Sequence, residues 1–107
     1  MKRSHKLDRL HHIAIVVEDI DRAIRWYQSQ FNASLIYADN TWAMLGFENI
    51  ELALVKAEQH PPHFAVIYEE AEKYGPLTRH RDGSESVYIK DSEGNSVELI
   101  RQITHTS

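Results

Sequence analysis

The chain contains no cysteine. This absence excludes disulfide bonds and removes thiolates from the possible metal ligands. Imidazole and carboxylate remain, and the sequence has seven histidines and 16 acidic residues. A metal site built from these groups would favour a borderline or hard divalent ion.

The sequence also lacks a long apolar run and a concentration of basic residues. No apolar segment approaches the length of a membrane span, and the basic start MKRSHKLDRL is not followed by the apolar segment of a secretory signal. Lysine and arginine are scattered in a chain of net charge −4, which argues against a nucleic-acid partner. We therefore expect no membrane and no nucleic acid as a partner, and a cytoplasmic location is the default expectation.

Proline is scarce, and two of the three prolines lie together in KAEQHPP at residues 56–62. Proline interrupts regular structure, so this stretch predicts a boundary between two halves. A chain of 107 residues is long enough for one hydrophobic core but too short for two. The expected organisation is a single domain, residues 1–107, with modules at about residues 8–56 and 62–104.

The same short phrase occurs in both halves. Residues 12–19 read HIAIVVED and residues 63–70 read HFAVIYEE, so that histidine, alanine and an acid recur in register. In a second match, IEL at residues 50–52 is repeated as VEL at residues 97–99. Such repetition indicates a duplication. It predicts matched positions for four candidate metal ligands: His12, Glu51, His63 and Glu98.

The first half predicts the order β-α-β-β-β. The β-branched run at residues 13–17 has the length of a strand, and Asp19 can cap a helix whose apolar face ends near Asn32. Turns rich in asparagine and acid separate three further predicted strands, at residues 33–38, 41–47 and 50–55.

The second half predicts the same order with a shortened helix. Residues 69–74 read EEAEKY, and Gly75 ends the expected helix after about two turns. Residues 86–90 and 96–102 are the last two predicted strands, and residues 77–80 are a weak candidate for the strand before them. The fold class is thus α+β, with two tandem βαβββ modules.

Side chains alternate between faces along a strand, and this alternation sorts the histidines. His12, His63 and Glu51 fall on faces that continue with alanine two positions later, which predicts open space above a shared site. His11 is expected on the face opposite His12. The remaining histidines have no repeated partner and are expected to be ordinary surface or hydrogen-bonded residues: His5, His60, His80 and His105.

These motifs resemble those of the vicinal oxygen chelate superfamily. That family includes glyoxalase I, methylmalonyl-CoA epimerase, extradiol dioxygenases, fosfomycin-resistance enzymes and bleomycin-binding proteins. The resemblance covers nearly the whole chain, from LHHIAIVVEDIDRAIRWY at residues 10–27 to SVYIKDSEGNSVELIRQ at residues 86–102. It implies paired βαβββ modules curled around a metal cup, and metal ligands at His12, His63, Glu98 and, on the fourth strand, Glu51.

The number of ligands separates two kinds of chemistry. With four, an ion of nickel, zinc, iron, manganese or cobalt would polarise a substrate bound through two oxygens, and Glu51 or Glu98 would be the catalytic base of a glyoxalase-like lyase or isomerase. With three, His12, His63 and Glu98 would form a facial triad suited to ferrous iron and dioxygen. The first interpretation is preferred, because the sequence assigns no auxiliary acid-base histidine for an extradiol-type dioxygenase.

A third interpretation is a metal-free binding protein of the bleomycin-resistance type, which the short chain favours and the retained ligand set opposes. In all three, the partner is a small molecule. Three strand aromatics, Tyr37, Trp42 and Tyr88, are candidates for the wall of its site, although such residues more often belong to the core.

Assembly is predicted from the shortened second helix. This helix would leave Phe64, Val66 and Tyr68 partly exposed on the face away from His63. Burial of exposed apolar side chains favours a symmetric homodimer.

Overall fold

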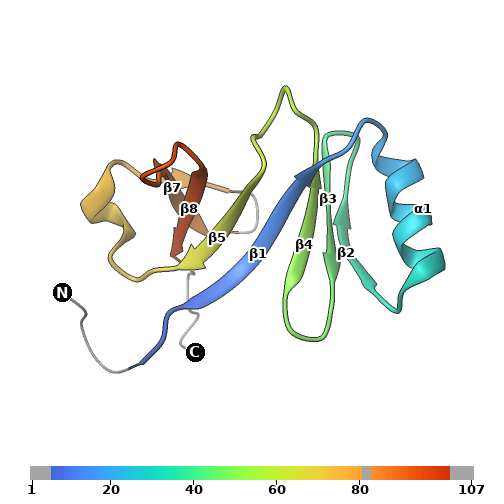
Figure 1. Ribbon diagram of the computed structural model, residues 1–107, viewed down its shortest axis with the longest axis horizontal. Helices are drawn as coiled ribbons and strands as arrows, with labels where there is room; N and C mark the ends of the chain where they lie inside the picture. The colour runs from blue at the N-terminus through green and yellow to red at the C-terminus, as the bar shows by residue number, and fades with distance from the viewer. Residues whose placement is uncertain (1–5, 81–82, 102–107) are drawn as a thin grey trace.

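The computed structural model describes residues 6–80 and 83–101. An eight-stranded sheet has the strand order β2-β3-β4-β1-β5-β8-β7-β6 (Figure 1), which confirms the predicted α+β class. Within these residues, no helix is long and apolar enough to cross a membrane. The elements are β1 (Arg9–Val16), α1 (Ile20–Gln30), β2 (Ser34–Ala38), β3 (Trp42–Gly46), β4 (Glu51–Val55), β5 (His63–Ile67), the 3₁₀ helix η1 (Ala71–Tyr74), β6 (Thr78–Arg79), β7 (Glu85–Lys90) and β8 (Ser96–Arg101).

Strands β1 and β5 form the middle of the sheet and join the two halves of the chain. They pair antiparallel, with His12 opposite Ala65 and Ala14 opposite His63. On their outer sides, β4 runs parallel to β1 and β8 runs parallel to β5. The two histidines therefore lie on neighbouring strands at the junction, where both halves contribute.

Helix α1 covers the first half of the sheet because it has one apolar face. The carboxylate of Asp19 caps the helix by accepting a hydrogen bond from a backbone N–H of the first turn at 2.9 Å. Ile20 and Ile24 are buried in one core with Leu45 and Leu54 of the sheet. Burial of each such side chain contributes roughly 1.5–3 kcal/mol, so this packing holds the helix on the sheet.

The second half has a four-residue 3₁₀ helix where the sequence predicts an α-helix of about two turns. Ala71 at its start is buried against Val97 and Leu99 of β8, so the contact with the sheet is kept. The segment ends at Gly75, whose φ of 144° is a backbone conformation that favours glycine. The predicted end at Gly75 is therefore correct, and the helix is shorter because residues 69–70, expected in its first turn, form a turn before it.

The outer face of β1 and β5 is only partly covered. Ile13 and Phe64 pair across the two strands, next in sequence to the central histidines, and 40% and 37% of their surfaces are exposed. Val66 and Tyr68 further along are half-buried. The predicted partial exposure of this face is therefore confirmed.

Candidate metal centre

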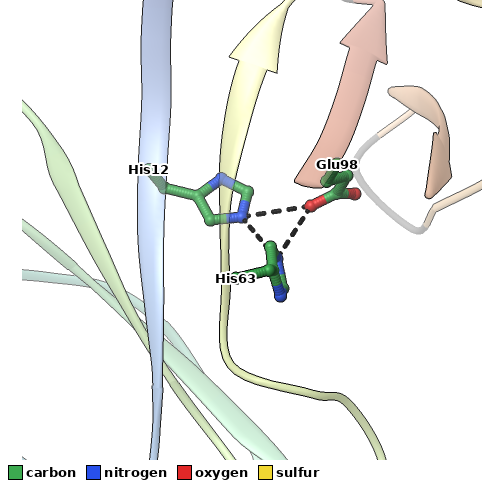
Figure 2. Close-up of side chains that lie close together, drawn as sticks. All are labelled: His12, His63 and Glu98. Atoms are coloured by element: carbon green, nitrogen blue, oxygen red, sulfur yellow. Dashed lines mark hydrogen bonds and ion pairs between the residues drawn. The ribbon is translucent and has the colours of Figure 1, made fainter. Parts of the chain in front are cut away.

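Three side chains from neighbouring strands point toward one another: His12 of β1, His63 of β5 and Glu98 of β8 (Figure 2). Nε2 of His63 lies 3.0 Å from Oε1 of Glu98, and Nε2 of His12 lies 3.3 Å from the same oxygen. The two Nε2 atoms are 3.4 Å apart. Two imidazole nitrogens and one carboxylate oxygen thus converge on one point, and this donor set fits a divalent transition-metal ion.

The group is buried, and Glu98 is ionised within it. The exposed fractions are 7% for His12, 9% for His63 and 4% for Glu98. Burial alone would raise the pKa of the Glu98 carboxyl, but hydrogen bonds with these histidines, His80 and Ser86 hold it well below its usual range. A buried carboxylate that keeps its charge needs a cationic or hydrogen-bonding partner, so the site is suited to hold a cation.

A backbone carbonyl orients His63 for metal binding. Its Nδ1 lies 2.8 Å from the carbonyl oxygen of Pro61, and only a protonated Nδ1 can donate to that acceptor. Nε2 is then the nitrogen that faces Glu98, to which it can donate a proton in the absence of metal, and its lone pair becomes available to an ion when that proton is lost. The orientation agrees with the role that the sequence predicts for His63.

Small side chains surround the three ligands, as the alternation pattern predicts. Ala14, Ala53 and Ala65 are buried on β1, β4 and β5. Because alanine ends at Cβ, these positions leave room beside the ligands. Of the three, Ala53 lines a cavity of about 340 Å³ together with the ligands, a volume within the range of small-molecule sites.

The cavity has an apolar wall and a polar wall. Trp42 and Met44 of β3 belong to the apolar wall, whereas His80 and Tyr88 belong to the polar wall on the second half. Trp42 and Tyr88 therefore lie where the sequence predicts, in contact with the cavity. Tyr37 does not line it and instead packs on Trp42, with the two ring centroids 4.6 Å apart.

Glu51, the fourth predicted ligand, lies outside this group. It is half-buried at the start of β4 and is not one of the residues that line the cavity. Among the residues that the structure describes, the ligand atoms that lie within 4.8 Å of one another belong to His12, His63 and Glu98. The role of Glu51 as a ligand or base stays a prediction that this geometry does not support.

The strand pairing explains why Glu51 and Glu98 are not equivalent. Ala14 pairs with Ala53 of β4, and Ala65, which takes the place of Ala14 in the second half, pairs with Glu98 of β8. Ala53 is therefore the structural counterpart of Glu98, and Glu51 lies two residues before it. The alignment of IEL with VEL sets Glu51 against Glu98, whereas the strand pairing sets Ala53 against Glu98. The two alignments differ by two residues, so the predicted equivalence of the two glutamates is wrong.

Tyr88 places a hydroxyl group beside the ligands. It pairs with Glu98 across β7 and β8, and its Oη lies 3.3 Å from Nε2 of His63. Burial and the nearby charge of Glu98 raise the pKa of the phenol. The hydroxyl therefore stays protonated at neutral pH and can donate a hydrogen bond to an oxygen atom bound at the site.

Three histidines that the sequence treats as ordinary or outward-facing also line the cavity: His11, His60 and His80. For His11, the predicted opposite face is wrong, because the register of β1 against β5 shifts between Leu10 and His12, as at a β-bulge. The shift brings His11 into contact with His12. The adjacent pair His11 and His12 was the feature of the sequence that could have indicated this contact. The assumption of strict alternation along the strand placed the two side chains on opposite faces instead.

His80 and His60 reach the cavity from connecting segments. Nε2 of His80 lies 2.7 Å from Oγ of Ser86 and 3.5 Å from Oε2 of Glu98. His60 lies in the linker before β5, and burial, together with the charges of His63 and His80, lowers its pKa. Neither residue has a repeated partner in the sequence, so the duplication gave no indication of them.

Comparison with known proteins identifies a family and a fold. The sequence model of the Glyoxalase/Bleomycin resistance protein/Dioxygenase superfamily matches residues 9–75, more than half of the chain. A hypothetical protein from Bacillus halodurans C-125 aligns with a TM-score of 0.74 and 14% identity over 95% of this chain and 99% of its own. A structure described as an NAD-dependent benzaldehyde dehydrogenase from Legionella pneumophila aligns with a TM-score of 0.57 and 14% identity over 84% and 96%. No curated protein sequence matches the chain significantly. At these identities the structures support the fold, and the activity must be argued from the site.

Proposed function

The chain belongs to the glyoxalase/bleomycin resistance protein/dioxygenase superfamily, and from this premise we propose a metal-dependent enzyme whose small substrate binds through two neighbouring oxygen atoms. His12, His63 and Glu98 would hold the ion. The observation that carries the proposal is the convergence of two Nε2 atoms and one carboxylate oxygen in a buried group beside a cavity of about 340 Å³.

The three-ligand arrangement favours a ferrous dioxygenase over a lyase or isomerase. Two imidazoles and one carboxylate form the facial triad that leaves ferrous iron with open positions for substrate and dioxygen. The lyase interpretation uses a second carboxylate as ligand or base. Ala53 takes the position that corresponds to Glu98, and Glu51 does not line the cavity, so that second carboxylate is missing from the described cavity wall.

The cavity also contains acid-base groups of the kind that a dioxygenase needs. The Tyr88 hydroxyl, 3.3 Å from Nε2 of His63, can donate a hydrogen bond to an ionised substrate oxygen next to the ligands. His80 lines the same wall, and its imidazole can take up a proton from the substrate and return it. These two residues fill the role for which the sequence alone offered no candidate.

The opposite wall favours an aromatic substrate. Trp42, Met44 and Val55 present apolar side chains to the cavity, and such a surface packs against a carbon skeleton and excludes water. A catechol has two adjacent oxygens for the ligand side and an apolar ring for this wall. A thiol hemithioacetal of glutathione is polar along most of its length and fits this division less well.

Oxygen uptake tests the proposal. Metal-free protein would be loaded with ferrous iron without air, and oxygen consumption measured with a panel of catechols, alongside isomerisation of a glutathione hemithioacetal. We expect oxygen consumption that requires a catechol, no isomerisation, and loss of both metal and activity in His12→Ala. Isomerisation without oxygen uptake would favour the lyase interpretation, and tight catechol binding without turnover would favour a binding protein.

A further inference from the structure

His11 contacts the ring nitrogen of His12 that points away from the other ligands. The Nδ1 atoms of the two histidines are 2.7 Å apart, and the rings meet edge to face with their planes at 80°. Nε2 of His12 faces Glu98 and His63 instead. Two unprotonated nitrogens would repel each other at this distance, so one of the two Nδ1 atoms carries a proton that it donates to the other.

The register shift in β1 makes this contact possible. In a regular strand, consecutive side chains point to opposite faces, and the rings of His11 and His12 would lie on opposite sides of the sheet. The shift between Leu10 and His12 allows both rings to line the cavity. Such irregularities commonly re-aim a side chain near a functional site.

The contact decides which nitrogen of His12 is available to a metal. A neutral imidazole has one proton, and when that proton lies on Nδ1 the lone pair lies on Nε2. His63 reaches this tautomer through the backbone carbonyl of Pro61 at 2.8 Å. His12 has the imidazole of His11 in the equivalent place, so the two ligand histidines are oriented by partners of different chemistry.

We propose that His11 is a positioning residue, which accepts the Nδ1–H of His12 and thereby fixes the ring orientation and tautomer of this ligand in the metal-bound site. The inference rests on the metal centre of the proposed function and is independent of the reaction catalysed there. Ligand histidines usually donate to a carboxylate, a carbonyl or water. In this protein the acceptor is a second histidine, next to the ligand in sequence.

Zinc affinity in a matched pair of variants tests this role. His11→Asn keeps an acceptor oxygen near the position of Nδ1, whereas His11→Leu has a similar size and no acceptor. We expect His11→Leu to bind zinc about 10–100-fold more weakly than the parent, as is usual when the partner of a ligand histidine is lost, and His11→Asn to stay close to the parent. Competition with a chromophoric chelator measures the affinity, and thermal unfolding verifies that each variant is folded.

A second measurement needs no substitution. In protein labelled with ¹⁵N, a scalar coupling between the two Nδ1 atoms across the shared hydrogen bond is expected with zinc bound. Absence of this coupling, or equal zinc affinity in all three proteins, would overturn the role of His11 while the metal centre stands. A parent protein that binds no zinc would overturn the metal centre itself, so the two failures are distinguishable.

Discussion

Glu98 is the side chain on which the metal centre depends most. One of its oxygens contacts both ligand histidines, and the other faces His80 at 3.5 Å. The neighbouring hydrogen bonds keep its pKa well below the usual range, so the charge persists despite burial. An ion bound here would gain its charge compensation from this one group, because Glu51 lies outside the cavity.

Two conservative substitutions compare the glutamates directly. Glu98→Gln should lose most of the bound metal, since a neutral amide replaces the only carboxylate of the ligand group. Glu51→Gln should retain both the metal and the oxygen-dependent activity. Metal content after gel filtration, with oxygen uptake on the same samples, measures both effects. Retention of metal in Glu98→Gln with loss in Glu51→Gln would place Glu51 in the centre and restore the four-ligand interpretation.

The sequence predicts His12, His63 and Glu98 from its two internal repeats, and the family resemblance implies the same three ligands. It misplaces Glu51 for a physical reason. Two residues are one full repeat of strand alternation, so an offset of two keeps every side chain on the same face. The alternation pattern therefore cannot detect the offset. Backbone pairing between strands sets the true equivalence, and that pairing involves residues distant in sequence.

Among the secondary-structure elements, those with strong local signals are predicted well. Helix α1 follows from the Asp19 cap and an apolar face, and all of the predicted strands form, including the weak candidate that becomes β6. The shift in β1 is not predicted, because no glycine or proline marks it in the sequence. Helix η1 ends at Gly75 as predicted but begins two residues later than expected, because Glu69 and Glu70 form a turn.

The cap of α1 gives a stability prediction that depends on pH. The hydrogen bond from the backbone of Arg22 lowers the pKa of Asp19. A carboxyl group with a lowered folded-state pKa stabilises the fold above its unfolded pKa of about 3.9, and this contribution is lost as the pH falls through the folded value. We therefore expect Asp19→Ala to lower the unfolding temperature at pH 7 and to have a smaller effect below about pH 3.

Circular dichroism at both pH values measures this difference. Asp19→Asn is the matched control, because its amide oxygen can still accept the N–H of the first turn. Its unfolding temperature should lie closer to that of the parent at pH 7. Equal unfolding temperatures for Asp19→Ala and the parent at pH 7 would show that the cap does not stabilise the helix.

The assembled molecule presents the Ile13 and Phe64 side chains on the outer face of its central strands. About 40% of each side chain is still exposed, so burial of the remainder in the homodimer predicted from the sequence would contribute roughly 1 kcal/mol per side chain. We expect a dimer at micromolar concentration by light scattering, and dissociation in Phe64→Ser. Leu35→Ser on the edge strand β2, also exposed, should leave the mass unchanged. A monomeric parent protein would contradict the prediction.

The junction of β1 with β5 also determines when the ligands can meet during folding. His12 and His63 are 51 residues apart in the chain, and His63 and Glu98 are 35 apart. Contacts over such separations form slowly, because the chain must first lose the entropy of the intervening loop. Neither half alone supplies all three ligands, so a folding chain cannot capture the ion fully until the halves have docked. Bound metal would then act chiefly on the unfolding rate, and removing it would shorten the lifetime of the folded protein more than it slows folding.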